Sequence, residues 1–131
     1  MRLLLDTLTI LWWQGDDAQL GQAARRAIGG AEVVFVSPAS AWELVIKGAL
    51  GKVRLPVPFE MVTEDNGFTQ LPISIAHVAT LSALPQHHAD AFDRILIAQA
   101  VSEQLTLVSH DRQFAPYGVP IIWTQPHLRT R

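Results

Sequence analysis

Short apolar segments that alternate with helical segments constrain the fold of this chain more than any other feature. The apolar segments are rich in branched residues and bounded by turn signals, so each is predicted to be a strand. They are residues 2–5, 32–36, 68–73, 105–108 and 119–123, the third being the weakest. Most are nearly continuous apolar runs, which is typical of a parallel sheet covered on both faces.

Helical segments separate these strands, and several carry start signals. Asp17, Ser37 and Ser74 occupy N-cap positions, and Pro38 suits a first helical position. Helices are predicted over residues 7–14, 18–28, 38–48, 59–65, 74–84 and 90–104. The alternation predicts an α/β fold: a three-layer α/β/α sandwich with a parallel sheet of about five strands. We expect one domain over residues 1–131, with a loose tail at 124–131.

The composition excludes several classes of protein. The chain has 131 residues, 49% of them apolar, and no cysteine, which excludes disulfide scaffolds and thiolate metal sites. No apolar run suits a membrane span, and the first one ends at Asp6, too early for a signal peptide. We therefore expect a cytoplasmic protein. The net charge of −2 disfavours simple duplex binding but is compatible with a nuclease that contacts phosphate through cations.

Two acids follow predicted strands at the edge where α/β sheets form their sites. Asp6 comes directly after the first strand, and Asp111 comes three residues after the fourth. Each has an ordinary alternative role, because aspartate is also common in turns and at helix starts.

A third acid, Glu43, lies on the predicted helix 38–48. At 3.6 residues per turn it borders an apolar stripe formed by Ala39, Trp42, Ile46, Ala49 and Leu50. The alternative is a weak surface pair with Lys47, four positions further on.

A fourth acid, Asp93, shares a helix face with the apolar residues Leu96, Ile97 and Ala100. A carboxylate on a buried face needs a partner, since an unpaired buried charge is costly. The alternative is an acid in the first turn of a helix that Asp90 caps, where the helix dipole favours it.

Acids that converge without bases repel one another unless one is protonated or a cation neutralises them. Oxygen ligands suit Mg²⁺ or Mn²⁺, the cations of phosphoryl chemistry.

Four motifs, in this order and spacing, resemble those of a PIN domain, and most of all those of the VapC-type toxin ribonucleases of bacterial toxin–antitoxin pairs. They are Leu3–Thr7 (LLLDT), Ser40–Leu44 (SAWEL) with Lys47, His87–Ala100 (HHADAFDRILIAQA) and Leu107–Phe114 (LVSHDRQF). The resemblance runs from Leu3 to Trp123. Two positions depart from it: Leu8, where the family often has histidine, and Ala91, where it often has proline.

The resemblance implies Mg²⁺-dependent hydrolysis of RNA phosphodiesters by a metal-activated water, with Mn²⁺ as a substitute. Asp6 and Asp93 would be the main metal ligands, and Glu43 would complete the shell or place the water. Asp111 would hold a second metal or its water, and Asp90 would be an accessory acid. Further residues would hydrogen-bond the acids or phosphate (Thr7, Ser109) or would contact RNA or pair with nearby acids (Arg94, Arg112).

The resemblance also implies partners: a homodimer, and a VapB-type antitoxin that inserts an Arg or Lys into the acidic groove. Residues His87 and His88 precede the acidic helix and are expected in a solvated loop, with metal ligation or a general-acid role as the alternative. Two alternatives stay open. A phosphatase of the haloacid dehalogenase type needs a second acid where this chain has Leu8. A PIN-like module that only binds RNA or protein would not need the four acids.

Overall fold

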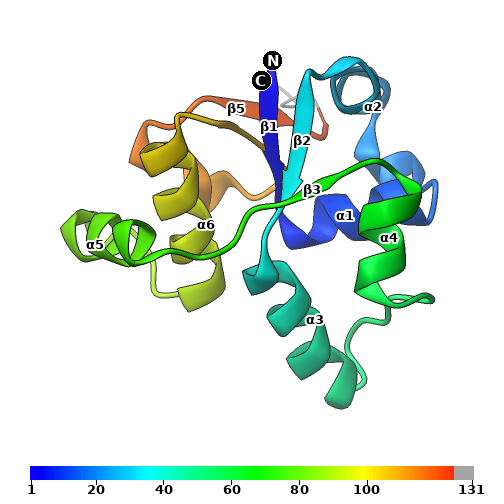
Figure 1. Cartoon of the computed structure of the whole chain (residues 1–131), viewed down its shortest axis with the longest axis horizontal. Helices are drawn as coiled ribbons and strands as arrows, with labels where there is room; N and C mark the ends of the chain where they lie inside the picture. The colour runs from blue at the N-terminus through cyan, green and yellow to red at the C-terminus, as the bar shows by residue number, and fades with distance from the viewer. Residues whose placement is uncertain (126–131) are drawn as a thin grey trace, which may run out of the picture.

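The predicted parallel sheet is confirmed by the computed structural model, which describes residues 1–125. Its five strands lie in the order β3-β2-β1-β4-β5, and all neighbouring pairs are parallel, so that β1 is central (Figure 1). The strands are β1 (Arg2–Leu5), β2 (Val33–Val36), β3 (Thr69–Gln70), β4 (Thr106–Ser109) and β5 (Ile121–Trp123).

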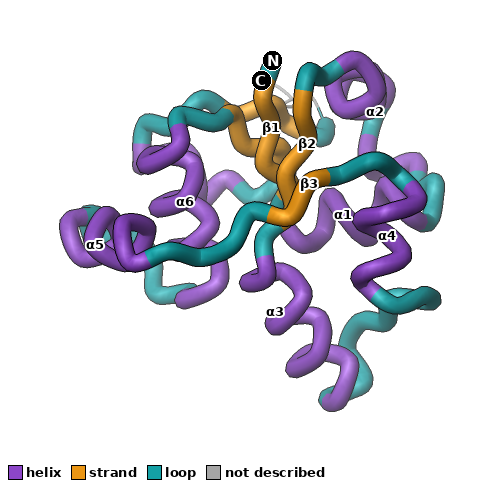
Figure 2. Tube along the Cα trace, in the orientation of Figure 1, coloured by secondary structure: helices purple, strands orange, loops and turns teal. Residues whose placement is uncertain are grey.

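Helices connect the strands (Figure 2). Those that follow Ser37 and Ser74 begin at the predicted caps, whereas the predicted cap Asp17 begins only a 3₁₀ turn. Side chains of Asp6, Ser37, Ser74 and Asp90 each accept a hydrogen bond from the first turn of the helix that follows. The helices are α1 (Thr7–Gln14), α2 (Gln22–Gly30), α3 (Pro38–Ala49), α4 (Phe59–Asp65), α5 (Ile75–Ala83) and α6 (Ala91–Glu103), with 3₁₀ turns η1 (Ala18–Leu20) and η2 (Arg112–Tyr117). Over residues 1–125, no helix combines the length and apolar character that crossing a membrane requires.

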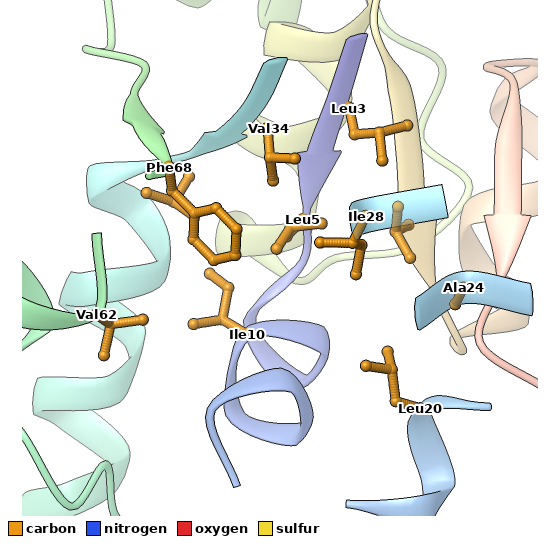
Figure 3. Packing of buried hydrophobic residues seen from close by; sticks show 11 residues of the cluster. Leu3, Leu5, Ile10, Leu20, Ala24, Ile28, Val34, Val62 and Phe68 are labelled. Atoms are coloured by element: carbon orange, nitrogen blue, oxygen red, sulfur yellow. The ribbon is translucent and has the colours of Figure 1, made fainter. Parts of the chain in front are cut away.

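Alternate side chains of β1 supply the two cores, one on each face of the sheet. Leu3 and Leu5 pack with residues of α1, α2 and α4 (Figure 3), whereas Leu4 packs with residues of α6 and η2. All three leucines are fully buried. The period of two along β1 therefore explains why helices must cover both faces, and the predicted three-layer sandwich is confirmed.

The predicted helix 18–28 is interrupted at Gly21. This residue has φ +77°, and a Cβ atom added to it would lie only 2.1 Å from the carbonyl oxygen of Thr124. Glycine is required there because the backbone needs both a left-handed region of φ and a close approach. The chain therefore forms η1, turns at Gly21 and restarts as α2. The predicted third strand is also shorter than expected, since only Thr69–Gln70 pair with β2.

The predicted loose tail is wrong at its first two residues. Thr124 is buried and its amide donates to the carbonyl oxygen of Ser109 (3.0 Å), which continues the β4–β5 pairing. The Gln125 amide donates to the carbonyl oxygens of Ala18 and Gln19. These bonds attach the end of β5 to η1, while residues 126–131 of the predicted tail lie outside the described residues.

Candidate active site

Five acids from distant segments of the chain lie close together at one end of the sheet. There β1 and β2 end, and α1, α3 and α6 begin (Figure 1). The grouping is evident in the ionisation of Asp93, whose pKa is raised to about 8. Burial is the largest cause, and repulsion by Asp90, Asp111, Glu43 and Asp6 adds to it. The four predicted catalytic acids and the accessory acid therefore share one electrostatic environment.

Asp6 is both a helix cap and a member of this group. Its Oδ1 accepts the amide of Thr9 (2.9 Å), which caps α1, and its Oδ2 accepts the hydroxyl of Ser109 (2.5 Å). The side chain is buried, and burial raises the pKa of its carboxyl, while the bonds from Ser109 and Thr9 act in the opposite direction. The alternative prediction for Asp6, a helix cap, is therefore correct. The cap uses only Oδ1, and Oδ2 is bound by Ser109.

Glu43 lies on the buried face of α3. Its Oε1 accepts the hydroxyl of Thr7 (2.6 Å), and its Oε2 accepts the ammonium of Lys47 (2.5 Å). The bond to Glu43 is the largest cause of a raised Lys47 pKa. The predicted pair with Lys47 exists, but it is not a surface pair, because Glu43 is only 5% exposed. Most of the predicted apolar stripe is instead exposed: Trp42, Ile46 and Leu50.

Asp90 and Asp93 begin α6. Asp90 is exposed and accepts the amide of Asp93 (2.9 Å), so it caps the helix as the capping alternative predicts. The side chain of Asp93 is 19% exposed, and its Oδ2 lies 3.4 Å from Nε2 of His88. The expectation of a solvated loop is wrong for His88, whose side chain is only 7% exposed, although His87 is exposed as expected.

Ser109 links two of the acids at the end of β4. Its hydroxyl donates to Asp6 and accepts the amide of Asp111 (3.0 Å). Asp111 in turn accepts the amide of Gln113 (2.9 Å) and caps η2. The predicted hydrogen bonds from Thr7 and Ser109 to acids are therefore present, and Ser109 couples the position of Asp111 to that of Asp6.

The two arginines differ in their surroundings. Arg94 is 8% exposed and donates to the carbonyl oxygen of Pro85 (2.8 Å) and to the hydroxyl of Tyr117 (3.1 Å). Arg112 is exposed, with its guanidinium 4.2 Å from the ring centroid of Trp123. Burial of Arg94 disfavours the predicted RNA contact at that position, whereas Arg112 keeps a cation at the surface beside Asp111. Over residues 1–125, no salt bridge joins either arginine to an acid.

The chemistry of the donors fits a divalent cation. Every candidate ligand is a carboxylate, and hard cations such as Mg²⁺ take oxygen ligands. Repulsion among the acids, seen in the raised pKa of Asp93, would be relieved by a bound positive charge. In the part of the chain that the structure describes, no three acids or histidines are arranged to hold a metal ion as they stand. Protein donors instead occupy the oxygens of Asp6 and Glu43.

The raised pKa of Asp93 predicts how pH affects the stability of the metal-free chain. Because the folded pKa (about 8) exceeds the ordinary value of 3.8, the folded state binds the extra proton between these limits. The favourable contribution of protonated Asp93 is therefore present at low pH and is lost as the pH rises through about 8. After a discount for solvent screening, we expect a loss on the order of 1–3 kcal/mol.

The measurement is urea unfolding with EDTA at pH 5 and pH 8.5, for the wild type and Asp93→Asn. The unfolding free energy of Asp93→Asn minus that of the wild type should grow with pH, because the amide of the variant does not ionise. Titrating groups that do not interact with Asp93 cancel in this difference. An advantage that is equal at the two pH values would contradict the raised pKa.

A group of carboxylates at the carboxyl end of a parallel sheet places this chain in the class of α/β domains with an acidic site at the sheet edge. The model of the PIN domain family matches residues 3–119, most of the chain, and so the chain belongs to the PIN domain family. Proteins of this kind that cleave RNA use a divalent metal. The family predicted from the four motifs is thus confirmed.

Individual proteins are also similar to this chain. The chain is 28% identical over 123 residues to Ribonuclease VapC22 of Mycobacterium tuberculosis, a match that covers 90% of this chain and 93% of the relative. DNA-bound VapBC from Salmonella typhimurium has a similar fold (TM-score 0.69, 16% identity, 95% of this chain and 99% of that one). So does VapBC2 from Rickettsia felis bound to a promoter DNA fragment (TM-score 0.66, 12% identity, 94% and 98%).

Proposed function

We propose that this chain is a Mg²⁺-dependent endoribonuclease that acts as the toxin of a toxin–antitoxin pair. The observation that carries the proposal is the cluster of five acids, in which four raise the pKa of the fifth. The PIN family match and the relative named as a ribonuclease support it. A phosphatase of the haloacid dehalogenase type is not favoured by any of these findings, and the binding-only alternative leaves the acid cluster unexplained.

In this proposal Asp6 and Asp93 hold the cation, and Glu43 completes the set or orients the attacking water. Asp111 serves a second metal position, and Asp90 is accessory. When bound, the divalent cation supplies Lewis-acid activation of water and stabilises charge on the phosphate. The chain's own groups orient the acids: Ser109 holds Oδ2 of Asp6.

Two further side chains act on Glu43 in this proposal. Thr7 donates to Oε1 and Lys47 donates to Oε2, so both oxygens have fixed partners. Lys47 also lies in the field of Asp90 and Asp93, and it therefore reduces the repulsion in the group. Exposed Arg112 is the candidate contact to RNA phosphate.

Removal of the metal tests this proposal directly. We expect wild-type protein to cleave a mixture of cellular RNAs with Mg²⁺ and to lose that activity in EDTA. Excess Mg²⁺ should restore it, and Mn²⁺ should substitute, because both suit oxygen ligands. Gel analysis of labelled RNA provides the measurement, and heat-inactivated protein is the control. Cleavage that persists in EDTA would exclude a metal-dependent mechanism.

We also propose that the chain forms a homodimer in the cytoplasm and is inhibited by a VapB-type antitoxin. The similar folds of VapBC complexes support such a partner. An antitoxin side chain that replaces the cation should be Arg or Lys, since the site is acidic. We expect a small protein encoded beside this gene to co-purify with the chain and to suppress cleavage. Light scattering measures the mass of the free chain, and a neighbour that binds without inhibiting would contradict the antitoxin role.

A further inference from the structure

A chain of hydrogen bonds leads from the protein interior to Asp93 and is not explained by the roles above. Nη1 of Arg94 lies 3.1 Å from the hydroxyl of Tyr117, which lies 2.9 Å from Nδ1 of His88. Nε2 on the opposite side of the same imidazole lies 3.4 Å from Oδ2 of Asp93. Arg94, Tyr117 and His88 are called the His88 relay below.

One arrangement of protons fits both ends of the His88 relay when Asp93 is ionised. Arginine can only donate hydrogen bonds, so Arg94 donates to the oxygen of Tyr117, and the single proton of the Tyr117 hydroxyl can then be directed at Nδ1 of His88. A neutral imidazole that accepts at Nδ1 carries its proton on Nε2, the nitrogen that faces Asp93. In this arrangement the N–H of His88 is directed toward the acid, and the ionised carboxylate accepts it.

The surroundings of the relay hold the imidazole in place. The rings of Tyr117 and Phe114 lie edge-on to His88, with centroids 5.5 Å and 6.2 Å away. The side chain of His88 is 7% exposed, and Arg94 is 8% exposed and also bonds the carbonyl oxygen of Pro85. Exclusion of water makes such bonds more effective than exposed ones. The relay therefore holds Nε2 of His88 in a fixed position beside Oδ2 of Asp93.

We propose that His88 is a positioning residue for Asp93: its Nε2–H holds Oδ2 and orients the carboxylate toward the cation, while Tyr117 and Arg94 lock the tautomer. The role in orienting a cation ligand rests on the proposed function, whereas the locked tautomer is a property of the metal-free protein. A donor directed at a carboxylate stabilises its ionised form, which is the form that binds cations.

The tautomer of His88 is the first test and does not depend on activity. Long-range ¹H–¹⁵N NMR of the metal-free protein at about pH 9.5, where Asp93 is ionised, distinguishes a protonated Nε2 from a protonated Nδ1. We expect Nε2–H in the wild type and a mixture of tautomers in Tyr117→Phe, which removes only the hydroxyl. A wild-type His88 that carries its proton on Nδ1 would overturn the proposal.

Cation affinity and kinetics form the second test, with a matched pair of amides at position 88. The Nε2 of glutamine can replace Nε2 of histidine, whereas the shorter asparagine reaches only the Nδ1 position. We expect His88→Asn to weaken Mn²⁺ binding, measured by calorimetry, by about 10-fold or more, as is typical when the partner of a ligand is removed. His88→Gln should recover most of the affinity. The control is Gln86→Asn, at an exposed residue of the same loop, and it should bind as the wild type does.

The kinetic readout separates positioning from RNA binding. With Mg²⁺ below saturation, His88→Asn and Tyr117→Phe should lower kcat and leave KM for RNA nearly unchanged. Equal Mn²⁺ affinity in His88→Asn, His88→Gln and wild type would refute the positioning role even if the wild type cleaves RNA. A wild type that does not cleave RNA would refute the proposed function, while the tautomer and calorimetric results would still decide whether His88 supports a cation ligand.

Discussion

Asp93→Asn should abolish RNA cleavage and leave the fold intact. The amide preserves the shape of the side chain and the backbone N–H that Asp90 accepts, but it removes the charge that the cation needs. The cation supplies several kcal/mol of charge stabilisation, so kcat should fall at least about 100-fold. A fluorogenic RNA cleaved in Mg²⁺ measures the rate, and calorimetry measures cation binding.

The matched control is Asp65→Asn, the same change at an exposed residue that ends α4. It should retain wild-type activity, which excludes a general effect of net charge on RNA binding. If Asp93→Asn bound cation and cleaved RNA as the wild type does, Asp93 would be only an acid in the first turn of α6. If Asp93→Asn were instead more stable than the wild type without metal and also inactive, the repulsion around Asp93 would be a cost in stability that cation binding requires.

The sheet and most helices were predictable because local signals agree with the tertiary structure. The apolar runs of β1 and β4 are long enough to pair, and Ser37 and Ser74 cap helices where their positions indicate. The break at Gly21 was not predictable, since it depends on the close approach of Thr124 from more than 100 residues away. Helix propensity over residues 18–28 contains no information about that contact.

The members of the acid cluster were predictable, but their partners were not. Strand ends locate Asp6 and Asp111, and helical spacing directs Asp93 inward. The pattern on α3 was misleading, because its apolar stripe is largely exposed and Glu43 is on the buried face. The sequence also contained no signal that His88, in a polar loop, would be enclosed by aromatic rings, since Phe114 and Tyr117 follow it by 26 and 29 positions.

Asp6 combines a structural and a chemical role, and two substitutions should separate them. Asp6→Asn keeps an oxygen that can accept the amide of Thr9, so the cap of α1 should survive, and its amide nitrogen can donate to Oγ of Ser109 in place of the bond that Oδ2 accepts. We expect it to lower the unfolding free energy by about 1 kcal/mol. Asp6→Ala removes the cap and also leaves the buried hydroxyl of Ser109 without its acceptor. We expect it to lower the unfolding free energy by about 2–4 kcal/mol, the sum of a lost cap and a buried unsatisfied donor.

Activity should not follow stability in this pair. Both variants lose the charge that would bind the cation, so each should lose at least about 100-fold in kcat, although only Asp6→Ala is markedly destabilised. Denaturant unfolding and RNA cleavage measured on the same preparations give the comparison. Near-wild-type cleavage by Asp6→Asn, with inactivity confined to Asp6→Ala, would mean that Asp6 acts through the cap alone. Loss in both variants would require the second oxygen, the one that Ser109 holds, to act as an ionised ligand.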